Sequence, residues 1–348
     1  MQTPYKRVMS ALRGEKPDKT PFTVYSEKLP QCSVERELRN RGLCPVKRIA
    51  SYKYYTPNVK ETACHYTDEQ GRNLVRTVYS TPYGDLSTLV EPAGFTSWTH
   101  ERMFKTPEDY KALLFMLKDT VVEPNYDAAA QVVADLGEDF VVRDGIPLEP
   151  MQGLISGGFI GMETWCMEWM ERRDEIMKLY EARVDINRRV YPLVANGPLE
   201  FANYGGNVVP QIIGPKVFRE YYLPHYNEAA EILHKKGKLI GCHFDADNTT
   251  IMDAIAETDL DYIEAYDPGM SPSVSEARRV WPDKVLWLNW PSAWHLRPTE
   301  EVKSATVGLI NEAAPGNGFI IGITEDVPEE RWRGNFTAIM DGIDEAAK

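Results

Sequence analysis

The pattern of apolar and polar positions divides the chain into three regions. Residues 5–12 have the spacing of an amphipathic helix, and a proline-rich turn separates them from the apolar run T-P-F-T-V-Y. Residues 60–98 alternate apolar and polar positions around Gly71 and Gly84, which is typical of antiparallel hairpins. In the remainder, helical segments and short apolar runs follow one another. This alternation predicts repeated βα units and therefore a parallel sheet.

Eight short apolar runs are predicted to be strands. They are T-P-F-T-V-Y at 20, F-V-V-R at 140, G-L-I-S at 153, L-E-F-A at 199, K-L-I-G-C-H at 238, D-Y-I-E-A at 261, V-L-W-L-N at 285 and F-I-I-G-I at 319. No G-x-G-x-x-G turn follows the first run, as a doubly wound sheet would normally require. The pattern therefore predicts an α/β fold, a (β/α)8 TIM barrel with an N-terminal helical segment and a hairpin insertion. We expect one domain over 1–348, with the insertion at about 60–98.

Composition and charge narrow the choice of partners. Hydrophobic residues make up 43% and charged residues 26% of the chain, which is ordinary for a globular protein. The net charge of -13 argues against a nucleic-acid groove or an anionic membrane surface, because both need clustered Lys and Arg. No apolar run reaches the roughly 18 residues of a membrane span, and the first residues lack a signal-peptide core. These features predict a cytoplasmic protein that binds small molecules or other proteins.

Polar side chains stand where several of the predicted strands end. In barrels of this class the catalytic residues lie at the carboxyl ends of the strands. The residues at these ends are Asp144, Asn203, Tyr204, His243, Asp245, Glu264, Asn289, Trp290, Thr324 and Glu325. The fold would bring them to one rim.

One imidazole and three carboxylates in this set predict a divalent-metal site with an open position, formed by His243, Asp245, Glu264 and Glu325. Glu264 interrupts an apolar strand, where an unpaired carboxylate would be costly. The alternative is that His243 is a core or capping residue and that D-A-D-N caps the helix that follows. Metal binding requires a neutral imidazole and ionised carboxylates, so acid should release the metal.

The aromatic cluster W-L-N-W-P-S-A-W-H follows the seventh predicted strand. Asn289, Trp290 and Trp294 in this cluster are candidates for a pocket that holds a flat aromatic substrate. The alternative is ordinary core packing. Both readings stay open at the level of sequence.

Several motifs resemble the uroporphyrinogen decarboxylase superfamily. They are R-V-M-S-A-L-R-G-E-K-P-D-K-T-P near the N-terminus, S-T-P-Y-G-D-L, I-S-G-G-F, I-I-G-P-K-V-F-R-E-Y-Y-L-P-H-Y followed by G-K-L-I-G-C-H, and P-D-K-V-L-W-L-N-W. The resemblance spans nearly the whole chain in the correct order. It implies a barrel fold.

The resemblance also separates two branches of the superfamily. The decarboxylases have an arginine-rich signature, M-R-Q-A-G-R-Y, where this chain reads T-V-Y-S-E-K-L-P-Q. The cobalamin-dependent methyltransferases hold zinc through H-x-C and a second, late cysteine. Here His243 matches the histidine, Asp245 stands at the first cysteine position, and Glu325 lies in the late strand region. Oxygen ligands leave a harder metal ion, which suits an ether oxygen better than a thiol.

The resemblance therefore implies a methyltransferase of an anaerobic O-demethylase system. Such an enzyme passes the methyl group of a methoxylated aromatic to the Co(I) corrinoid of a partner protein, and it uses zinc. Asn203 and Tyr204 could orient or protonate the ether oxygen. The chain lacks the corrinoid signature D-x-H-x-x-G, so the cobalamin would arrive on the partner. The alternatives are methanol, an amine or a thiol as substrate, or a barrel without catalysis.

Overall fold

Eight parallel strands close into a barrel in the order β1-β14-β13-β12-β11-β10-β9-β2. The structure is a computed structural model that describes residues 2–94 and 96–348. The barrel strands are β1 (Phe22–Tyr25), β2 (Leu43–Ile49), β9 (Val141–Gly145), β10 (Phe201–Tyr204), β11 (Leu239–His243), β12 (Tyr262–Tyr266), β13 (Val285–Asn289) and β14 (Phe319–Ile323). The predicted α/β class and the (β/α)8 barrel are confirmed.

Seven of the eight predicted strands are barrel strands, and one is wrong. G-L-I-S lies in the short helix α5 (Pro150–Ser156), which begins at a proline in the first helical turn. So short an apolar run does not show whether its period is that of a helix or a strand. The missed strand is β2, whose sequence L-C-P-V-K-R-I contains a proline and two basic residues. One predicted strand is false and one barrel strand was missed, so the predicted number of strands is still eight. The fourth to eighth predicted strands are the fourth to eighth barrel strands, β10 to β14.

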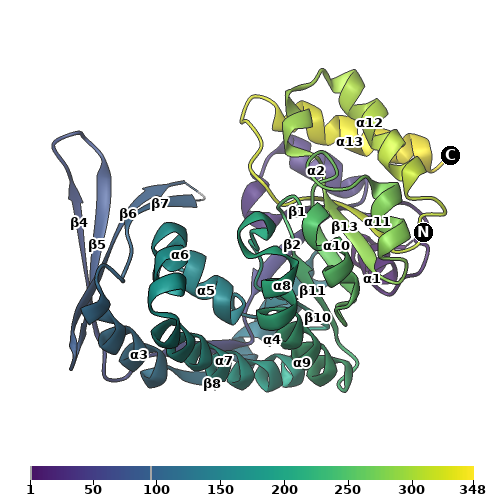
Figure 1. Ribbon diagram of the computed structural model, residues 1–348. Helices are drawn as coiled ribbons and strands as arrows, with labels where there is room; N and C mark the ends of the chain where they lie inside the picture. Colours follow the sequence, from purple (N-terminus) through teal and green to yellow (C-terminus); the bar gives the residue numbers. More distant parts are fainter. Residues whose placement is uncertain (1, 95) are drawn as a thin grey trace. The chain divides into compact units, whose positions relative to one another are not determined.

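The helices of the barrel unit precede, follow or connect its strands along the chain (Figure 1). They are α1 (Pro4–Leu12), α2 (Ser33–Asn40), α4 (Tyr126–Leu136), α8 (Pro210–Tyr221), α9 (Leu223–His234), α10 (Met252–Ala256), α11 (Val274–Val280), α12 (Thr299–Glu312) and α13 (Trp332–Ala346). The last two lie side by side in Figure 1, and Lys303 of α12 pairs with Glu345 of α13 at 2.6 Å.

The barrel interior is filled by every second residue of each strand, as the two-residue period of a strand requires. Buried interior side chains form one cluster with the apolar face of α1: Val8, Met9, Ala11, Leu12, Tyr25, Cys44, Val46, Val141, Phe201, Tyr262, Val285, Trp287 and Ile320. Gly241 makes room for the Tyr262 ring, since a side chain there would overlap the ring. The interior is therefore a packed core below the rim that carries the polar strand ends.

The chain divides into two compact units. The barrel unit comprises Met1–Ser51, Tyr126–Gly145 and Val194–Lys348, and the second unit comprises Tyr52–Asn125 and Ile146–Leu193. None of the helices among the described residues combines the length and the hydrophobicity of a membrane span.

The second unit contains the antiparallel strands expected near residues 60–98. Its four-stranded sheet has the order β4 (Lys60–Thr67), β5 (Asn73–Thr81), β6 (Gly84–Ala93) and β7 (Thr96–Glu101), and a smaller sheet pairs β3 (Tyr52–Tyr55) with β8 (Val121–Pro124). The helices are α3 (Tyr110–Asp119), α5, α6 (Met162–Glu171) and most of α7 (Arg173–Asn196). At the β4–β5 turn, Asp68 accepts hydrogen bonds from the backbone of Gln70 and Arg72 at 3.0 and 2.9 Å. This local contact explains why the polar run between the two strands turns.

Candidate metal centre

A fully buried carboxylate, Glu264 of β12, lies at the centre of the polar cluster. Its Oε1 accepts hydrogen bonds from the Tyr25 hydroxyl, at 2.7 Å, and from the Arg143 guanidinium. Its Oε2 accepts from Asn203 Nδ2 at 2.7 Å and lies 3.0 Å from Nδ1 of His243. The five side chains come from five barrel strands, and each stands at an interior position of its strand.

The charge on Glu264 is balanced by Arg143, which is also buried. Burial alone would raise the pKa of Glu264, but Arg143, His243 and the Tyr25 hydroxyl hold that pKa well below its usual range. The carboxylate therefore stays ionised. Its two oxygens, with about four acceptor positions, already meet four donors.

The two ring nitrogens of His243 face different partners. Nδ1 faces Glu264, whereas Nε2 lies 3.6 Å from Asp245 Oδ2 and 3.8 Å from Glu325 Oε1. Burial would lower the pKa of His243, but its contacts with Asp245 and Glu264 raise the pKa to about 9. The imidazole thus joins a buried anion on one side to two more accessible carboxylates on the other.

His243, Asp245 and Glu325 could hold a metal ion between them. One ligand atom from each residue lies within 4.8 Å of the other two. In a tetrahedral zinc site, bond lengths of about 2.0–2.2 Å place neighbouring ligand atoms about 3.3–3.6 Å apart, close to the separations from Nε2. Metal-bound histidines usually donate their second N–H to a carboxylate, which is the position of Glu264. The donor set fits a divalent ion.

The structure thus brings together three of the four expected metal ligands. The fourth, Glu264, stands behind the imidazole with both oxygens engaged. Tyr25 and Arg143 were not expected in this cluster. The sequence contains a feature that could have identified Arg143: it is a charged residue within the apolar strand F-V-V-R, just as Glu264 is within D-Y-I-E-A.

Two aspartates in the polar loop after β11 have different contacts. Asp247 Oδ1 accepts from the backbone N–H of Thr249 at 3.0 Å and from its hydroxyl at 2.6 Å, a local turn just before the short helix η4 (Thr249–Ile251), whose N-cap residue is Asn248. Asp245 instead faces His243. A local turn therefore accounts for Asp247 but leaves Asp245 for another role.

Asn203 and Tyr204 are neighbours in β10 and point to opposite faces of the barrel wall. Asn203 faces the interior and contacts Glu264, and its Oδ1 is buried without a hydrogen-bond partner among the described residues. Tyr204 is fully buried against Tyr226 of α9, with ring centroids 5.2 Å apart. The structure does not bring Tyr204 to the cluster.

The residues expected to bind substrate have the following contacts within the barrel unit. Trp290 is fully buried, and its Nε1 donates to Thr306 of α12 at 2.9 Å. Asn289 accepts hydrogen bonds from Thr324, at 2.9 Å from its backbone nitrogen, and so joins the ends of β13 and β14. Trp294 is half-buried, with the Arg297 guanidinium 4.2 Å above its ring. These contacts are those of core and loop packing.

Two unusual backbone positions help to place the cluster. Ala265 follows Glu264 with a φ of +62°, and the pairing of β12 with β13 shifts between Glu264 and Tyr266. Such bulges re-aim side chains near functional sites. Gly206 has a φ of +120°, and a Cβ there would lie 2.5 Å from the Cβ of His243. The loop after β10 can approach His243 only because residue 206 is glycine.

Comparison with one solved structure supports the barrel fold. A methyltransferase from Methanosarcina mazei is similar over 99% of both chains, with 12% identity and a TM-score of 0.58. A B12-independent methionine synthase from Shewanella sp. W3-18-1 in complex with selenomethionine covers 89% of this chain and 84% of its own, with 9% identity and a TM-score of 0.41. Neither a family model nor a curated protein sequence matches the chain. At 12% identity, the likeness to the first of these structures shows the barrel fold alone.

Proposed function

We propose that this protein is a zinc-dependent methyltransferase that transfers the methyl group of a methoxylated aromatic to the Co(I) corrinoid of a partner protein. The observation that carries the proposal is that the two ring nitrogens of His243 face different partners. Nε2 faces Asp245 and Glu325, whereas Nδ1 faces the buried Glu264. The methyltransferase-like barrel supports the general class. The oxygen-rich donor set supports the choice of an ether.

In this proposal His243, Asp245 and Glu325 hold the zinc, which would act as a Lewis acid on the ether oxygen. Glu264 fixes the imidazole orientation by accepting the Nδ1 proton, so that Nε2, once it has lost its own proton, could donate its lone pair to the zinc. Arg143 keeps Glu264 ionised, and Asn203 holds its second oxygen. Asn203 is thus a positioning residue, whereas we assign Tyr204 to packing.

The composition of the site favours an oxygen-linked methyl group over a thiol. No cysteine belongs to the group of possible ligands among the described residues. Cys242 precedes His243 in β11 but is buried on the other face of the strand, with its Sγ 3.6 Å from the Tyr226 hydroxyl. Carboxylate oxygens leave zinc more electrophilic than thiolates do, which helps an aryl oxide to leave.

The metal is tested first by its stoichiometry. We expect one zinc per chain after dialysis against a zinc buffer, measured by atomic emission. Asp245→Asn and Glu325→Gln should each lower the zinc affinity about tenfold or more, because each removes a charged ligand. Asp326→Asn is the matched control, since this neighbouring carboxylate pairs with Lys28. Wild-type protein without bound zinc would contradict the metal site.

The reaction is tested with cob(I)alamin as methyl acceptor and vanillate as donor. We expect methylcobalamin and the demethylated phenol to form in equal amounts, and we expect the His243→Ala variant to be inactive while its circular dichroism stays unchanged. Transfer from methanol, an amine or a thiol, but not from the ether, would favour the other substrate classes. Zinc binding without transfer from any of these donors would favour a barrel that binds metal but does not catalyse methyl transfer.

A further inference from the structure

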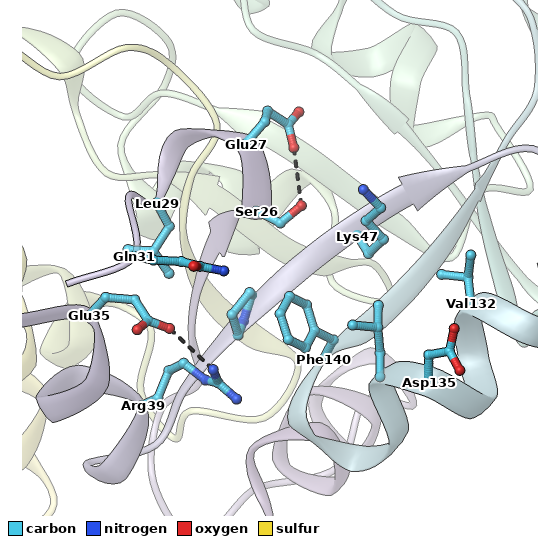
Figure 2. A pocket seen from close by; sticks show the side chains of 12 residues that line it. Ser26, Glu27, Leu29, Gln31, Glu35, Arg39, Lys47, Val132, Asp135 and Phe140 are labelled. Atoms are coloured by element: carbon cyan, nitrogen blue, oxygen red, sulfur yellow. Dashed lines mark hydrogen bonds and ion pairs between the residues drawn. The ribbon is translucent and has the colours of Figure 1, made fainter. Parts of the chain in front are cut away.

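A cavity of about 470 Å³ lies on the outer side of β2, within the barrel unit. Pro45 and Lys47 face it, because they alternate with the interior residues Cys44 and Val46 of the same strand. The remaining lining comes from the short helix η1 (Ser26–Lys28), from α2 and from the region of α4, as Figure 2 shows. The cavity is distinct from the candidate metal centre, whose residues face the barrel interior.

One part of the cavity wall is apolar. It is formed by Leu29, Pro45, Val132, Leu136 and Phe140. Leu136 and Phe140 remain half-exposed, and α4 has Ala129 as its one fully buried residue among those described. Apolar side chains at a concave, partly open surface are typical of small-molecule sites, and this volume lies within their usual range of roughly 300–1,000 Å³.

The acidic side chains of the cavity already have partners. Glu27 pairs with Arg48, Glu35 lies 3.2 Å from Arg39, and Asp135 accepts from Gln131 at 2.7 Å. Figure 2 shows the Glu35–Arg39 contact at one end of the cavity.

Lys47 differs from the other charged residues of the cavity. It is half-buried, and it has no hydrogen bond or ion pair among the described residues. The cavity thus offers one uncompensated ammonium group beside an apolar wall, in a chain whose net charge is -13. An anion with an apolar body would satisfy both features.

We infer that this cavity binds a small organic monoanion, a carboxylate or sulfonate with an apolar body, whose anionic group pairs with Lys47. A dianion such as a phosphate ester would gain no second free cation and would lie near Glu27 and Asp135. A neutral ligand would leave Lys47 without a partner. The inference does not depend on the proposed methyltransferase activity.

The probe is 2-naphthoate, titrated calorimetrically into the full-length protein, with neutral 2-naphthamide as the matched ligand. We expect saturable binding of naphthoate and at least tenfold weaker binding of the amide, because a hydrogen bond to a charged group contributes roughly a factor of ten or more. Lys47→Met should lower naphthoate affinity by about the same factor, whereas Lys236→Met, an exposed lysine outside the cavity, should leave it unchanged.

A second variant, Leu136→Trp, fills the cavity without changing its charge. It should abolish naphthoate binding while circular dichroism and the thermal midpoint stay close to those of the wild type. The inference is overturned if the wild-type protein shows no saturable binding, if the amide binds as well as the acid, or if both cavity variants bind naphthoate unchanged. The last result would place the probe elsewhere, for example at the barrel mouth.

Discussion

At the scale of single residues, Glu264 and Arg143 are the most consequential pair. Both are buried, and each compensates the charge of the other. Because the pKa of Glu264 lies below its unfolded value of 4.5, ionised Glu264 stabilises the fold at neutral pH. This contribution is lost as the pH falls below about 4.5 toward the lowered folded value.

The stability losses from removing the two members of this pair should not add. We expect Glu264→Gln or Arg143→Met to lower the free energy of unfolding by about 3–5 kcal/mol, because each leaves a buried group uncompensated. The double variant should lose less than the sum of the single losses. Urea unfolding followed by tryptophan fluorescence measures all three. Additive losses would show that the two charges do not depend on each other.

Gly206 offers a second test at the same scale. Gly206→Ala would place a Cβ 2.5 Å from His243 Cβ at a φ of +120°, so either the loop or the histidine must move. We expect a loss of about 1–3 kcal/mol in unfolding free energy, together with weaker zinc binding. Gly237→Ala is the control, since it also has positive φ, +70°, but no atom within 4 Å of its Cβ. It should show the backbone cost without the loss of zinc affinity.

At the scale of the strands, small residues decide how the barrel interior is filled. Gly241 of β11 faces Tyr262 of β12, and Gly322 of β14 lies beside Trp287 of β13. Large rings therefore occupy the space that neighbouring strands leave free. This division between glycine and aromatic residues keeps the layer below the candidate metal centre dense.

We expect Gly241→Ala to destabilise the barrel by about 1–3 kcal/mol, because the added methyl group overlaps the ring of Tyr262. Gly308→Ala in α12 is the opposite case. Its Cβ would meet no atom within 4 Å, and alanine in a helix is favoured over glycine by about 0.5–1 kcal/mol. Differential scanning calorimetry should give a lower midpoint for the first variant and a higher one for the second. Equal midpoints would contradict the packing argument.

At the scale of the whole molecule, one buried histidine couples stability to pH. His295 lies in the loop after β13, where its Nδ1 is 3.2 Å from Asn335 Nδ2 of α13. Burial lowers the pKa of His295 from 6.5 to about 4. The folded protein keeps this imidazole neutral between these two values, whereas the unfolded chain binds a proton.

Stability should therefore fall as the pH is lowered from about 6.5 to 4, with a total loss of about 3 kcal/mol from His295. The variant His295→Gln keeps a hydrogen-bond acceptor for Asn335 but cannot titrate, so its unfolding free energy should change less over this range. Urea unfolding at several pH values measures the slope. The control His65→Gln, on exposed strand β4, should keep the wild-type slope.

Periodicity and strand-end chemistry in the sequence determined much of this molecule. The alternation of apolar runs with helical segments predicted a parallel barrel, and His243, Asp245 and Glu325 were identified because each lies at or just beyond a strand end. Their convergence follows from barrel closure. The short run G-L-I-S and the proline-containing β2 were misassigned, because local pattern is weakest in short segments.

Only the tertiary structure decided which side of each strand faces the cluster. Tyr204 is adjacent to Asn203 in sequence but packs on the opposite face, while Tyr25 and Arg143 join Glu264 from strands distant in the chain. That choice depends on the register between strands and on the bulge at Ala265, both of which arise from contacts far apart in sequence. The sequence thus determined which polar residues stand at the strand ends, and closure of the barrel determined which of them contact one another.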